Sequence, residues 1–271
     1  MDGAAKVSVG KKRAAKMRLD LLLVERGHAP SRERAHALIL AGRVLVREQK
    51  IDKPGTSVLA DAPLRLLGDD PLYVSRGGLK LAAALKDWRI EVAGRICLDV
   101  GASTGGFTDC LLQHGAAHVT AVDTGFGQIA MKLRNDSRVR LMERTNARLL
   151  EPGALVAGGH NPTLLVMDVS FISATLVLPA VFAAAPSLVE AAILVKPQFE
   201  ARREHVGKGG IVRNPEAHEL AVAKVADCVR SLGWQVAATM SSPITGMEGN
   251  LEFLLYARRE PDASSRPDPL H

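Results

Sequence analysis

The stretch LDVGASTGGFTD, residues 98–109, decides the fold that we expect for this chain. A short apolar run containing Asp99 breaks into glycines and leads into a helix-like segment that begins near Phe107. A strand, a glycine turn and a helix in this order are typical of nucleotide-binding α/β proteins, in which the ligand lies over the turn. The stretch therefore raises the question of which ligand its glycines admit.

Two phosphate-binding motifs fail to match these glycines. A P-loop needs a lysine directly after its last glycine, and no lysine follows Gly105 and Gly106, which excludes a triphosphate site of that type. A dinucleotide fingerprint needs G-x-G-x-x-G, and Ser103 stands where the second glycine belongs. A dehydrogenase is therefore disfavoured.

Asp123 indicates which other ligand could bind. It ends the next apolar run, 22 residues after Gly101. A carboxylate at that strand end can accept hydrogen bonds from both hydroxyls of a ribose. The free N–H groups at the start of the helix can bind a carboxylate. A ribose and a carboxylate without phosphate describe S-adenosylmethionine, and an ordinary turn between strand and helix is the alternative. The candidate cofactor contacts in this region are Gly101, Ser103, Thr104, Gly105, Gly106, Phe107 and Asp123.

Apolar runs alternate with helix-like spacers through the rest of the chain. The runs that we predict to be strands are RICLDV, HVTAVD, VRLME, LLVMDV, AILVKP, WQVAAT and EFLLYA. A helix follows Asn214, with Pro215 in its first turn and Gly233 after its end. The alternation predicts an α/β, Rossmann-like domain, with a mostly parallel seven-stranded sheet, helices on both faces and ligands at the carboxyl ends of the strands.

The first fifth of the chain carries the excess positive charge. Residues 1–60 hold 13 Lys and Arg against 6 Asp and Glu, whereas the remaining residues are close to neutral. Helices over residues 18–27 and 31–42, followed by strands at 43–46 and 62–67, predict a small basic α+β module that binds polyanions. A solvated basic face is the alternative.

The expected organisation has five parts. They are a basic arm (1–16), the basic module (17–67), a linker (68–78), the large α/β domain (79–260) and a tail (261–271). The three cysteines, Cys97, Cys110 and Cys228, show no metal-ligand spacing, so we expect no metal site and a reducing compartment. The apolar segment 176–195 is interrupted by prolines and Glu190, so we expect a cytoplasmic protein that does not enter a membrane.

Four charged residues lie where apolar runs begin or end. Asp168 closes LLVMD and Lys196 closes AAILVK, and charges in such places are costly unless they are paired or used. Lys80 follows the linker and Glu252 opens the last strand. For Lys80 a helix-surface position, and for Glu252 a solvated strand start, are the alternatives.

The motifs together resemble those of the TlyA (haemolysin A) family over residues 17–258. The matching stretches are SRGGLKL, LDVGASTGGFTDCLLQHGAAHVTAVDTGFGQ, LRNDSRV, ERTNAR, MDVSFIS, LVKPQFE and GNLEF. The resemblance implies an S4-type RNA-binding module joined to a class I methyltransferase domain of the FtsJ/RrmJ type. It also implies S-adenosylmethionine-dependent 2′-O-methylation of ribosomal RNA at a cytidine. Lys80, Asp168, Lys196 and Glu252 match the catalytic Lys-Asp-Lys-Glu tetrad of that type.

The chemistry of this reaction suits these four residues. A ribose 2′-hydroxyl must lose its proton as it attacks the methyl group, and a lysine whose amine is kept neutral by a nearby cation can take that proton. We therefore expect Lys196 to be the base, with Lys80 and the sulfonium as the nearby cations. Asp168 then orients Lys196 and itself lies near the methyl group as a further cofactor contact, and Glu252 positions Lys80 and the sugar.

The resemblance to the S4 module implies which residues contact RNA. Within it, Arg32, Arg34 and Arg43 are the first candidates for phosphate contacts, and Arg18, Lys50 and Lys53 are further ones. Outside this module, Arg76 and Arg144 are additional candidates for RNA contacts. Asn146, in RTNAR, is expected near the adenine, although an ordinary exposed loop is equally consistent with that motif. Arg47-Glu48-Gln49 replaces the Asn-Gly of many members, which predicts a different turn.

Two other functions are compatible with the same sequence. The first is a non-catalytic RNA-binding or ribosome-assembly factor with a vestigial methyltransferase fold, and the second is a membrane-active haemolysin. Intact Asp123, Asp168 and Lys196 argue against the first. The lack of a strongly amphipathic basic helix argues against the second. We expect a monomer, because RNA rather than a second subunit would order the two domains.

Overall fold

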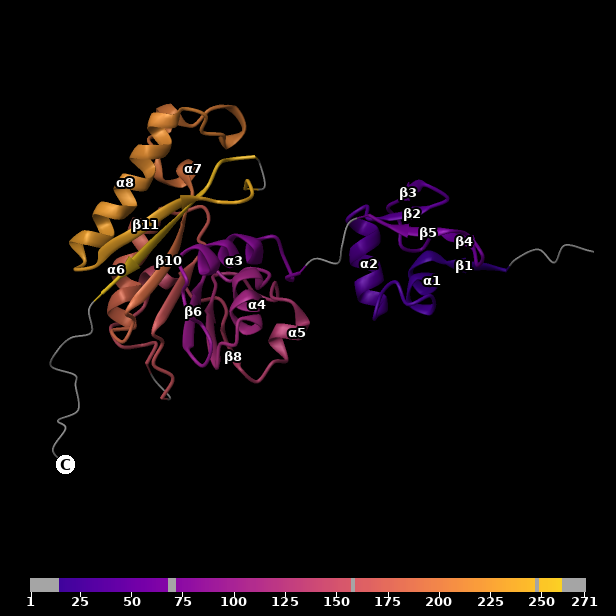
Figure 1. Ribbon diagram of the computed structural model, residues 1–271, viewed down its shortest axis with the longest axis horizontal. Helices are drawn as coiled ribbons and strands as arrows, with labels where there is room; N and C mark the ends of the chain where they lie inside the picture. The colour runs from indigo at the N-terminus through magenta and orange to yellow at the C-terminus, as the bar shows by residue number, and fades with distance from the viewer. Residues whose placement is uncertain (1–14, 68–71, 157–158, 247–248, 260–271) are drawn as a thin grey trace, which may run out of the picture. The chain divides into compact units, whose positions relative to one another are not determined.

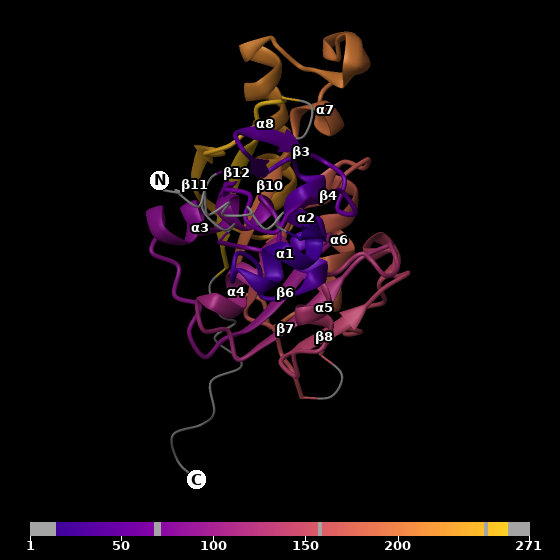
Figure 2. The same ribbon diagram turned by 90° about the vertical axis from the view of Figure 1, so that its right-hand side faces the viewer.

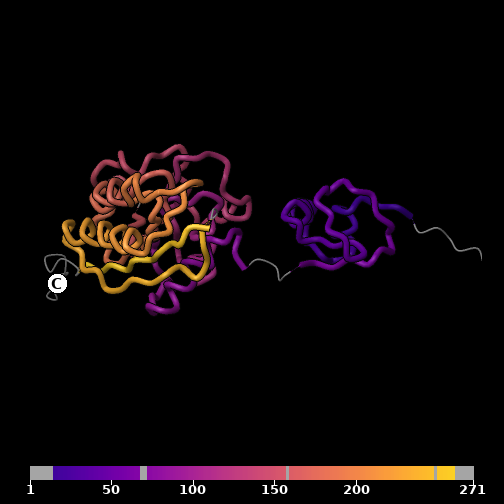
Figure 3. Tube along the Cα trace, turned by 90° about the horizontal axis from the view of Figure 1, so that it is seen from above, coloured from indigo at the N-terminus to yellow at the C-terminus, as the bar shows by residue number. Residues whose placement is uncertain are grey.

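The computed structural model describes residues 15–67, 72–156, 159–246 and 249–259. Its contacts divide the chain into an N-terminal unit, residues 1–70, and a C-terminal unit, residues 71–271. Figures 1 and 3 follow the chain through each unit. Of the expected arm and tail, all but Ala15 and Lys16 lie outside the described residues.

The N-terminal unit is a small α+β module. Its elements are β1 (Lys16–Arg18), α1 (Leu19–Glu25), α2 (Arg32–Leu40), β2 (Val44–Val46), β3 (Gln49–Ile51), β4 (Ser57–Leu59) and β5 (Leu64–Leu66). Strand β1 pairs antiparallel with β4, and β2 lies between β3 and β5, antiparallel to both. Leucines of both helices, among them Leu22, Leu23 and Leu38, pack with the strands in one core.

Local signals fix the ends of both helices. Ser31 caps α2 by accepting a hydrogen bond from the Arg34 N–H at 3.2 Å. Gly27 and Gly42 follow α1 and α2 in the left-handed region, with φ of 72° and 64°. The structure corrects the prediction at three short strands. Lys16, placed in the arm, starts β1, and residues 49–51 and 57–59, where no strand was predicted, form β3 and β4.

The β2–β3 hairpin corrects the expectation of an unusual turn. Val46 pairs with Gln49, so Arg47 and Glu48 form a two-residue connection. Both have positive φ, 52° and 64°, as a type I′ turn requires, and this is the geometry that Asn-Gly favours. The Glu48 carboxylate accepts a hydrogen bond from Arg65 Nε at 3.0 Å, which ties the tip of the hairpin to β5.

The C-terminal unit contains one seven-stranded sheet. Its strands are β6 (Ile96–Val100), β7 (His118–Val122), β8 (Val139–Met142), β9 (Leu164–Met167), β10 (Glu190–Val195), β11 (Gln235–Ser241) and β12 (Phe253–Arg258). All seven coincide with the predicted runs, to within two residues at each end. Their order in the sheet is β11-β12-β10-β9-β6-β7-β8. Strand β12 is antiparallel to both of its neighbours, and the other pairs are parallel. The predicted Rossmann-like fold is therefore confirmed.

Helices cover both faces of this sheet. The helical elements are α3 (Gly77–Asp87), α4 (Gly106–Gln113), α5 (Met131–Arg134), η1 (Ala147–Leu149), α6 (Ala174–Ala184), α7 (Pro197–Glu200), η2 (Arg203–His205), η3 (Lys208–Gly210) and α8 (Pro215–Ser231). Residues of α6 and α8 form one apolar core with the sheet, and residues of α3 and α4 form the other. Figure 2 shows α3 and α6 on opposite sides of the strands.

The expected linker is partly an integral piece of the C-terminal unit. Tyr73 is buried in the core beneath α3 and α4. The Val74 N–H donates to Asp109 Oδ2 at 2.8 Å, and Gly78 packs so tightly on Tyr73 that a Cβ there would lie 2.3 Å from its ring. These contacts hold the described residues 72–78 against the domain, so the linker expected over 68–78 is too long.

Of the helices in the described parts of the chain, none has the length and apolar composition that a membrane span requires.

Candidate functional site

The carboxyl ends of four parallel strands bring the candidate residues to one edge of the sheet. Val100 on β6 pairs with Val122 on β7 and with Met167 on β9. Gly101, Asp123 and Asp168, which directly follow these three residues, therefore leave the sheet at the same level. Lys196 follows the end of β10, whose Ile193 pairs with Met167. We call this the strand-end edge.

Lys196 is held by two partners at this edge. Its Nζ lies 2.5 Å from Asp168 Oδ1 and donates a hydrogen bond to Ser170 Oγ at 2.6 Å. The side chains of Lys196 and Asp168 are only 10% and 20% exposed. Burial and two partners fix the amine of Lys196 in one place, with little freedom to turn toward water.

Lys80 and Glu252 form a second buried ion pair. Lys80 lies in the first half of α3, Glu252 directly precedes β12, and the Lys80 amine donates to the Glu252 carboxylate. Phe253 pairs with Val195, so Glu252 and Lys196 flank adjacent positions of β12 and β10. The reversed direction of β12 thus brings the start of that strand to the strand-end edge. Lys80 is therefore not at the helix surface, and Glu252 is not at a solvated strand start, which were the alternatives considered from the sequence.

The glycine turn has an alternating left-handed backbone. Gly101, Ser103 and Gly105 have φ of 88°, 49° and 94°. A Cβ on Gly101 would lie 2.4 Å from the backbone oxygen of Asp168, and a Cβ on Gly105 would lie 2.3 Å from Leu133. These two glycines therefore let the turn pack against β9 and α5, a role that the ligand-based interpretation did not include.

Asp123 links the turn to a small pocket. Its Oδ2 accepts a hydrogen bond from the Ser103 N–H at 2.8 Å and its Oδ1 accepts one from the Gly125 N–H at 2.6 Å. Each carboxylate oxygen has two lone pairs, so both can accept a further donor. The pocket beside it is lined by Ala102, Ser103, Ala121, Asp123, Gly125, Gln128, Ile129, Leu141 and Glu143. The carboxylate of Asp123 thus lies at this pocket beside the apolar side chains of Ile129 and Leu141.

The other predicted cofactor contacts differ in exposure. Ser103 and Thr104 are exposed at the rim of the turn. Gly106 is buried, and a Cβ there would lie 2.2 Å from Ser75 Oγ. The side chain of Phe107 lies in the core with α3 and α4, so only its backbone can face a ligand. The exposed Asn146 caps η1 by accepting from the Arg148 N–H at 3.1 Å.

Asp99 is a buried carboxyl group beneath the strand-end edge. Burial raises its pKa to about 7, and the nearby Asp168 and Asp123 add to the rise. Thr108 opposes this rise by donating a hydrogen bond to Asp99 Oδ2 at 2.6 Å. Near neutral pH this position therefore holds both the neutral and the charged form.

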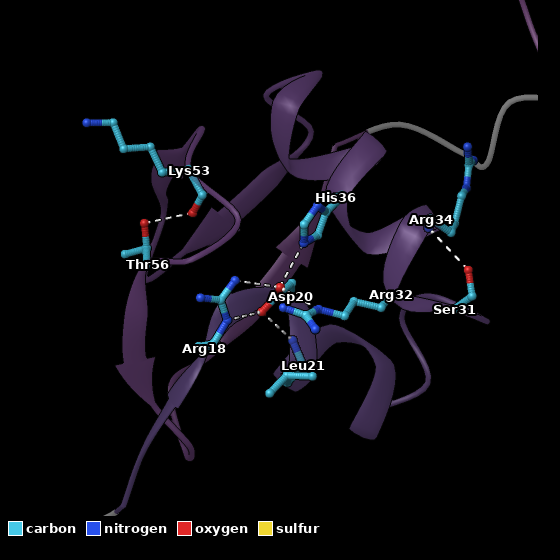
Figure 4. Close-up of polar contacts among 9 residues, drawn as sticks. All are labelled: Arg18, Asp20, Leu21, Ser31, Arg32, Arg34, His36, Lys53 and Thr56. Carbon is cyan, nitrogen blue, oxygen red and sulfur yellow. Dashed lines mark hydrogen bonds and ion pairs between the residues drawn. The ribbon is translucent and has the colours of Figure 1, made fainter. Parts of the chain in front are cut away.

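The predicted RNA-binding residues of the N-terminal unit differ in how they are held. Arg18 and Arg32 are both paired to Asp20 (Figure 4). Arg43 donates through Nε to the Leu67 oxygen at 2.8 Å, and so it also has a structural contact. Lys50 and Lys53 are exposed, and Figure 4 shows the side chains of Lys53 and Arg34 directed away from Asp20.

Two further predicted RNA contacts lie on the C-terminal unit. Arg76 is exposed and donates to the Thr245 oxygen at 2.7 Å. Arg144 lies over the ring of Phe126, with 4.2 Å between its guanidinium carbon and the ring centroid. Phe126 is itself exposed, so this pair presents a cation and an aromatic ring to solvent.

Sequence reasoning missed two residues that shape the strand-end edge. Ser170 contacts Lys196, as described above. Glu200 is buried, and its Oε1 accepts a hydrogen bond from the N–H of Ala174, the first residue of α6, at 2.6 Å. Glu200 thereby joins the segment after Lys196 to the segment after Asp168. The sequence did offer one indication of Glu200, since it is the acidic residue that ends the motif LVKPQFE.

Comparisons with known proteins agree with this geometry. A model of the FtsJ-like methyltransferases matches residues 73–259, and a model of the S4 domain matches residues 17–62. The chain is 46% identical to the 16S/23S rRNA (cytidine-2′-O)-methyltransferase TlyA of Mycobacterium tuberculosis over 92% of each chain. It is 48% identical to a candidate rRNA methyltransferase of Bacillus subtilis, over 89% of this chain and 85% of that one. A solved structure, named as a candidate hemolysin from Streptococcus thermophilus, is 42% identical. The match covers 90% of this chain and 88% of the chain in that structure, with a TM-score of 0.68.

Proposed function

The chain belongs to the FtsJ-like methyltransferase family, with an S4 domain ahead of the methyltransferase domain, and from this membership we propose that it methylates ribose 2′-hydroxyls of ribosomal RNA. S-adenosylmethionine supplies the methyl group when it is bound. A cytidine is the proposed target nucleotide, because the TlyA relatives of Mycobacterium tuberculosis and Campylobacter jejuni are named for that specificity.

The observation that carries this proposal is the pairing of Lys196 with Asp168 directly beside the glycine turn. Asp168 touches both features, since its carboxylate pairs with Lys196 and its backbone oxygen packs on Gly101. The amine that would take a proton is therefore fixed at the same end of the sheet as the glycine turn to which we assign the cofactor. We assign Lys196 as the base that accepts the proton of the ribose 2′-hydroxyl, with Asp168 and Ser170 holding its amine in position.

The remaining residues of the site have binding roles in this proposal. Glu252, at the start of the neighbouring strand β12, is paired with Lys80 of α3, and this buried pair would hold the sugar against Lys196. Asp123 would accept the hydroxyls of the cofactor ribose, and the residues beside Ile129 would hold its adenine. Fixing the sugar and the base relative to each other supplies a large part of the rate in reactions of this kind.

The N-terminal unit is the proposed RNA-binding module. It carries the excess positive charge of the chain and presents arginines that suit phosphates. Structured RNA is read mainly through its shape, its phosphates and its 2′-hydroxyls, so we expect this unit to supply affinity and little base selection. A monomer acting in the cytoplasm, where ribosomes are made, completes the proposal.

A methyl-transfer assay on ribosomal particles tests this function. Purified protein is incubated with S-adenosylmethionine carrying a labelled methyl group and with unmethylated 30S, 50S and 70S particles, and the modified nucleotide is then mapped. Label on a ribose 2′-oxygen that depends on Lys196 is the expected result. No transfer to any particle, or transfer to a base atom, would contradict the proposal.

A further inference from the structure

A buried carboxylate organises the cations of the N-terminal unit. The side chain of Asp20 is fully buried, yet it accepts five hydrogen bonds. Arg18 donates through Nε and Nη2 at 3.0 and 2.9 Å, Arg32 donates through Nε at 2.9 Å, and His36 Nε2 lies 2.8 Å away. The Leu21 N–H provides the fifth, at 3.0 Å. Figure 4 shows the three side chains converging on this one group.

The three partners of Asp20 remain open to solvent on their other sides. The side chains of Arg18, Arg32 and His36 are 47%, 53% and 41% exposed. A guanidinium has five N–H groups, and Asp20 engages two of those on Arg18 and one of those on Arg32. Hydrogen bonds from Arg18, His36 and Arg32 hold the pKa of Asp20 well below its usual range, despite its burial.

The backbone around Asp20 makes the arrangement rigid. The Asp20 N–H donates to the Pro54 oxygen at 3.1 Å, and the Leu19 N–H donates to the Thr56 oxygen at 2.9 Å. The Arg18 guanidinium lies over Gly55, where a Cβ would be 3.1 Å from Nη1. The start of α1, the start of α2 and the segment before β4 therefore meet at Asp20.

We propose that Asp20 is a positioning residue for RNA binding, which holds Arg18, Arg32 and His36 as one preformed site for a backbone phosphate. This inference rests on the proposed function, because it takes ribosomal RNA as the ligand. His36 and Asp20 are additions to the RNA-binding residues predicted from the sequence. Two arginines and a histidine that stay about half exposed while paired to Asp20 suit the oxygens of a phosphate diester. Ordering these long side chains before RNA arrives removes an entropic cost that binding would otherwise carry.

A positioning role for Asp20 and a simple count of charges predict opposite changes in the affinity for RNA. Asp20→Asn makes the basic unit more positive by one charge, so long-range electrostatics alone would tighten RNA binding. If Asp20 positions the cations, the same change releases Arg18 and Arg32 and weakens binding. The matched control is Asp61→Asn, an exposed carboxylate in the same unit whose removal changes the net charge equally.

The experiment measures the affinity of the full-length chain for an unmethylated rRNA fragment over a range of salt concentrations. We expect Asp20→Asn to weaken binding about fivefold or more, with a shallower salt dependence. Asp61→Asn is expected to bind as tightly as the wild type or tighter. In an Arg18→Ala/Arg32→Ala background Asp20→Asn should have little further effect, because its influence acts through those residues.

A second variant keeps the test valid if Asp20→Asn does not fold. Arg32→Lys keeps the charge at an exposed site, but lysine lacks the fork that serves Asp20 and a phosphate together, so its affinity should also fall. Wild-type affinity for Arg32→Lys, or wild-type or tighter binding by a folded Asp20→Asn, would overturn the positioning role. Failure of the wild-type chain to bind rRNA would instead overturn the proposed function.

Discussion

Lys196 Nζ lies 2.5 Å from Asp168 Oδ1, although the two residues are 28 positions apart in the chain. Their proximity follows from the parallel pairing of β10 with β9, which brings the ends of both strands to the same edge of the sheet. Ser170, two residues beyond Asp168, contacts the same amine. The site is therefore built on the ends of rigid strands, and its geometry depends little on side-chain choice elsewhere in the loops.

Lys196→Ala is expected to abolish methyl transfer while leaving the fold intact. General-base catalysis contributes about 100-fold or more, so the single-turnover rate should fall by at least that factor at every pH. Lys86→Ala, at an exposed lysine of α3, is the matched control and should keep the wild-type rate. A near-normal rate for Lys196→Ala would remove Lys196 from the mechanism.

Asp123→Asn is expected to weaken cofactor binding. A hydrogen bond to a charged acceptor contributes about 1.5–3 kcal/mol, so the dissociation constant for S-adenosylmethionine should rise about tenfold or more. Calorimetric titration measures this constant, and affinity for rRNA serves as the control that should not change. Unchanged cofactor affinity would show that the ribose binds elsewhere.

Gly101→Ala is expected to damage the site through close packing. The new Cβ would lie 2.4 Å from the Asp168 backbone oxygen, so β9 must shift away from the turn. Gly94→Ala is the control, because Gly94 also has a positive φ, 73°, but a Cβ there meets nothing within 4 Å. Both changes should cost about 1 kcal/mol of unfolding free energy for the left-handed backbone.

The two glycine variants are expected to differ in stability and in methyl-transfer rate. Gly101→Ala should lose additional stability in denaturant unfolding and most of its methyl-transfer rate, whereas Gly94→Ala should transfer methyl groups normally. Equal stability and equal activity of the two variants would mean that the contact with Asp168 has no consequence.

Asp99→Asn is expected to change how stability depends on pH. Folding raises the pKa of Asp99 from 3.8 to about 7, so between these values the folded chain holds a proton that the unfolded chain releases. The contribution of Asp99 to stability therefore falls as pH rises through this window, by at most about 1.4 kcal/mol per pH unit. Asparagine does not titrate, so the unfolding free energy of Asp99→Asn should increase relative to that of the wild type as the pH rises from 5 to 7.

Denaturant unfolding of the wild type and Asp99→Asn at pH 5, 6, 7 and 8 measures that difference. Asparagine keeps an oxygen for the hydrogen bond from Thr108, so the comparison isolates the charge. A difference in unfolding free energy that stays constant over the whole range would contradict the raised pKa.

The double change Arg47→Asn/Glu48→Gly is expected to stabilise the N-terminal unit. Both positions have positive φ, where glycine removes strain of about 1 kcal/mol and asparagine is well tolerated. The lost pair between Glu48 and Arg65 is exposed, and exposed ion pairs contribute little to stability. Denaturant unfolding should show the gain, and Arg65→Ala, which breaks only the ion pair, should show a small loss. A net loss for the double variant would mean that the ion pair outweighs the strain.

The sequence was sufficient to predict the large domain. Strands β9 and β10 are nearly continuous apolar runs, and such runs are typical of strands buried on both faces. The charged residues that close these runs, Asp123, Asp168 and Lys196, lie at the strand-end edge because parallel strands end there together. The resemblance to the TlyA family is confirmed by the identity to TlyA of Mycobacterium tuberculosis, and the two family models confirm its FtsJ-like and S4 parts.

The features that were missed depend on contacts between distant residues. Strands β1, β3 and β4 have three residues each, too few to show a period. Tyr73 is buried because Asp109 holds the backbone beside it, and nothing in GDDPLYVSRGG indicates that contact. Asp20 was counted only as an acid in a basic segment, since its partners on α2 become visible only once the helices pack. Ser170 was missed because its contact with Lys196 exists only once β9 and β10 are paired.

The order of the strands has a consequence for biosynthesis. Strand β12 follows β11 in the chain but lies between β10 and β11, so β11 has no partner in this sheet until β12 has left the ribosome. Glu252 directly precedes β12 and is the partner of Lys80, which was made 172 residues earlier. A nascent chain can fold its N-terminal unit early, but it cannot form the Lys80–Glu252 pair until Glu252 has left the ribosome.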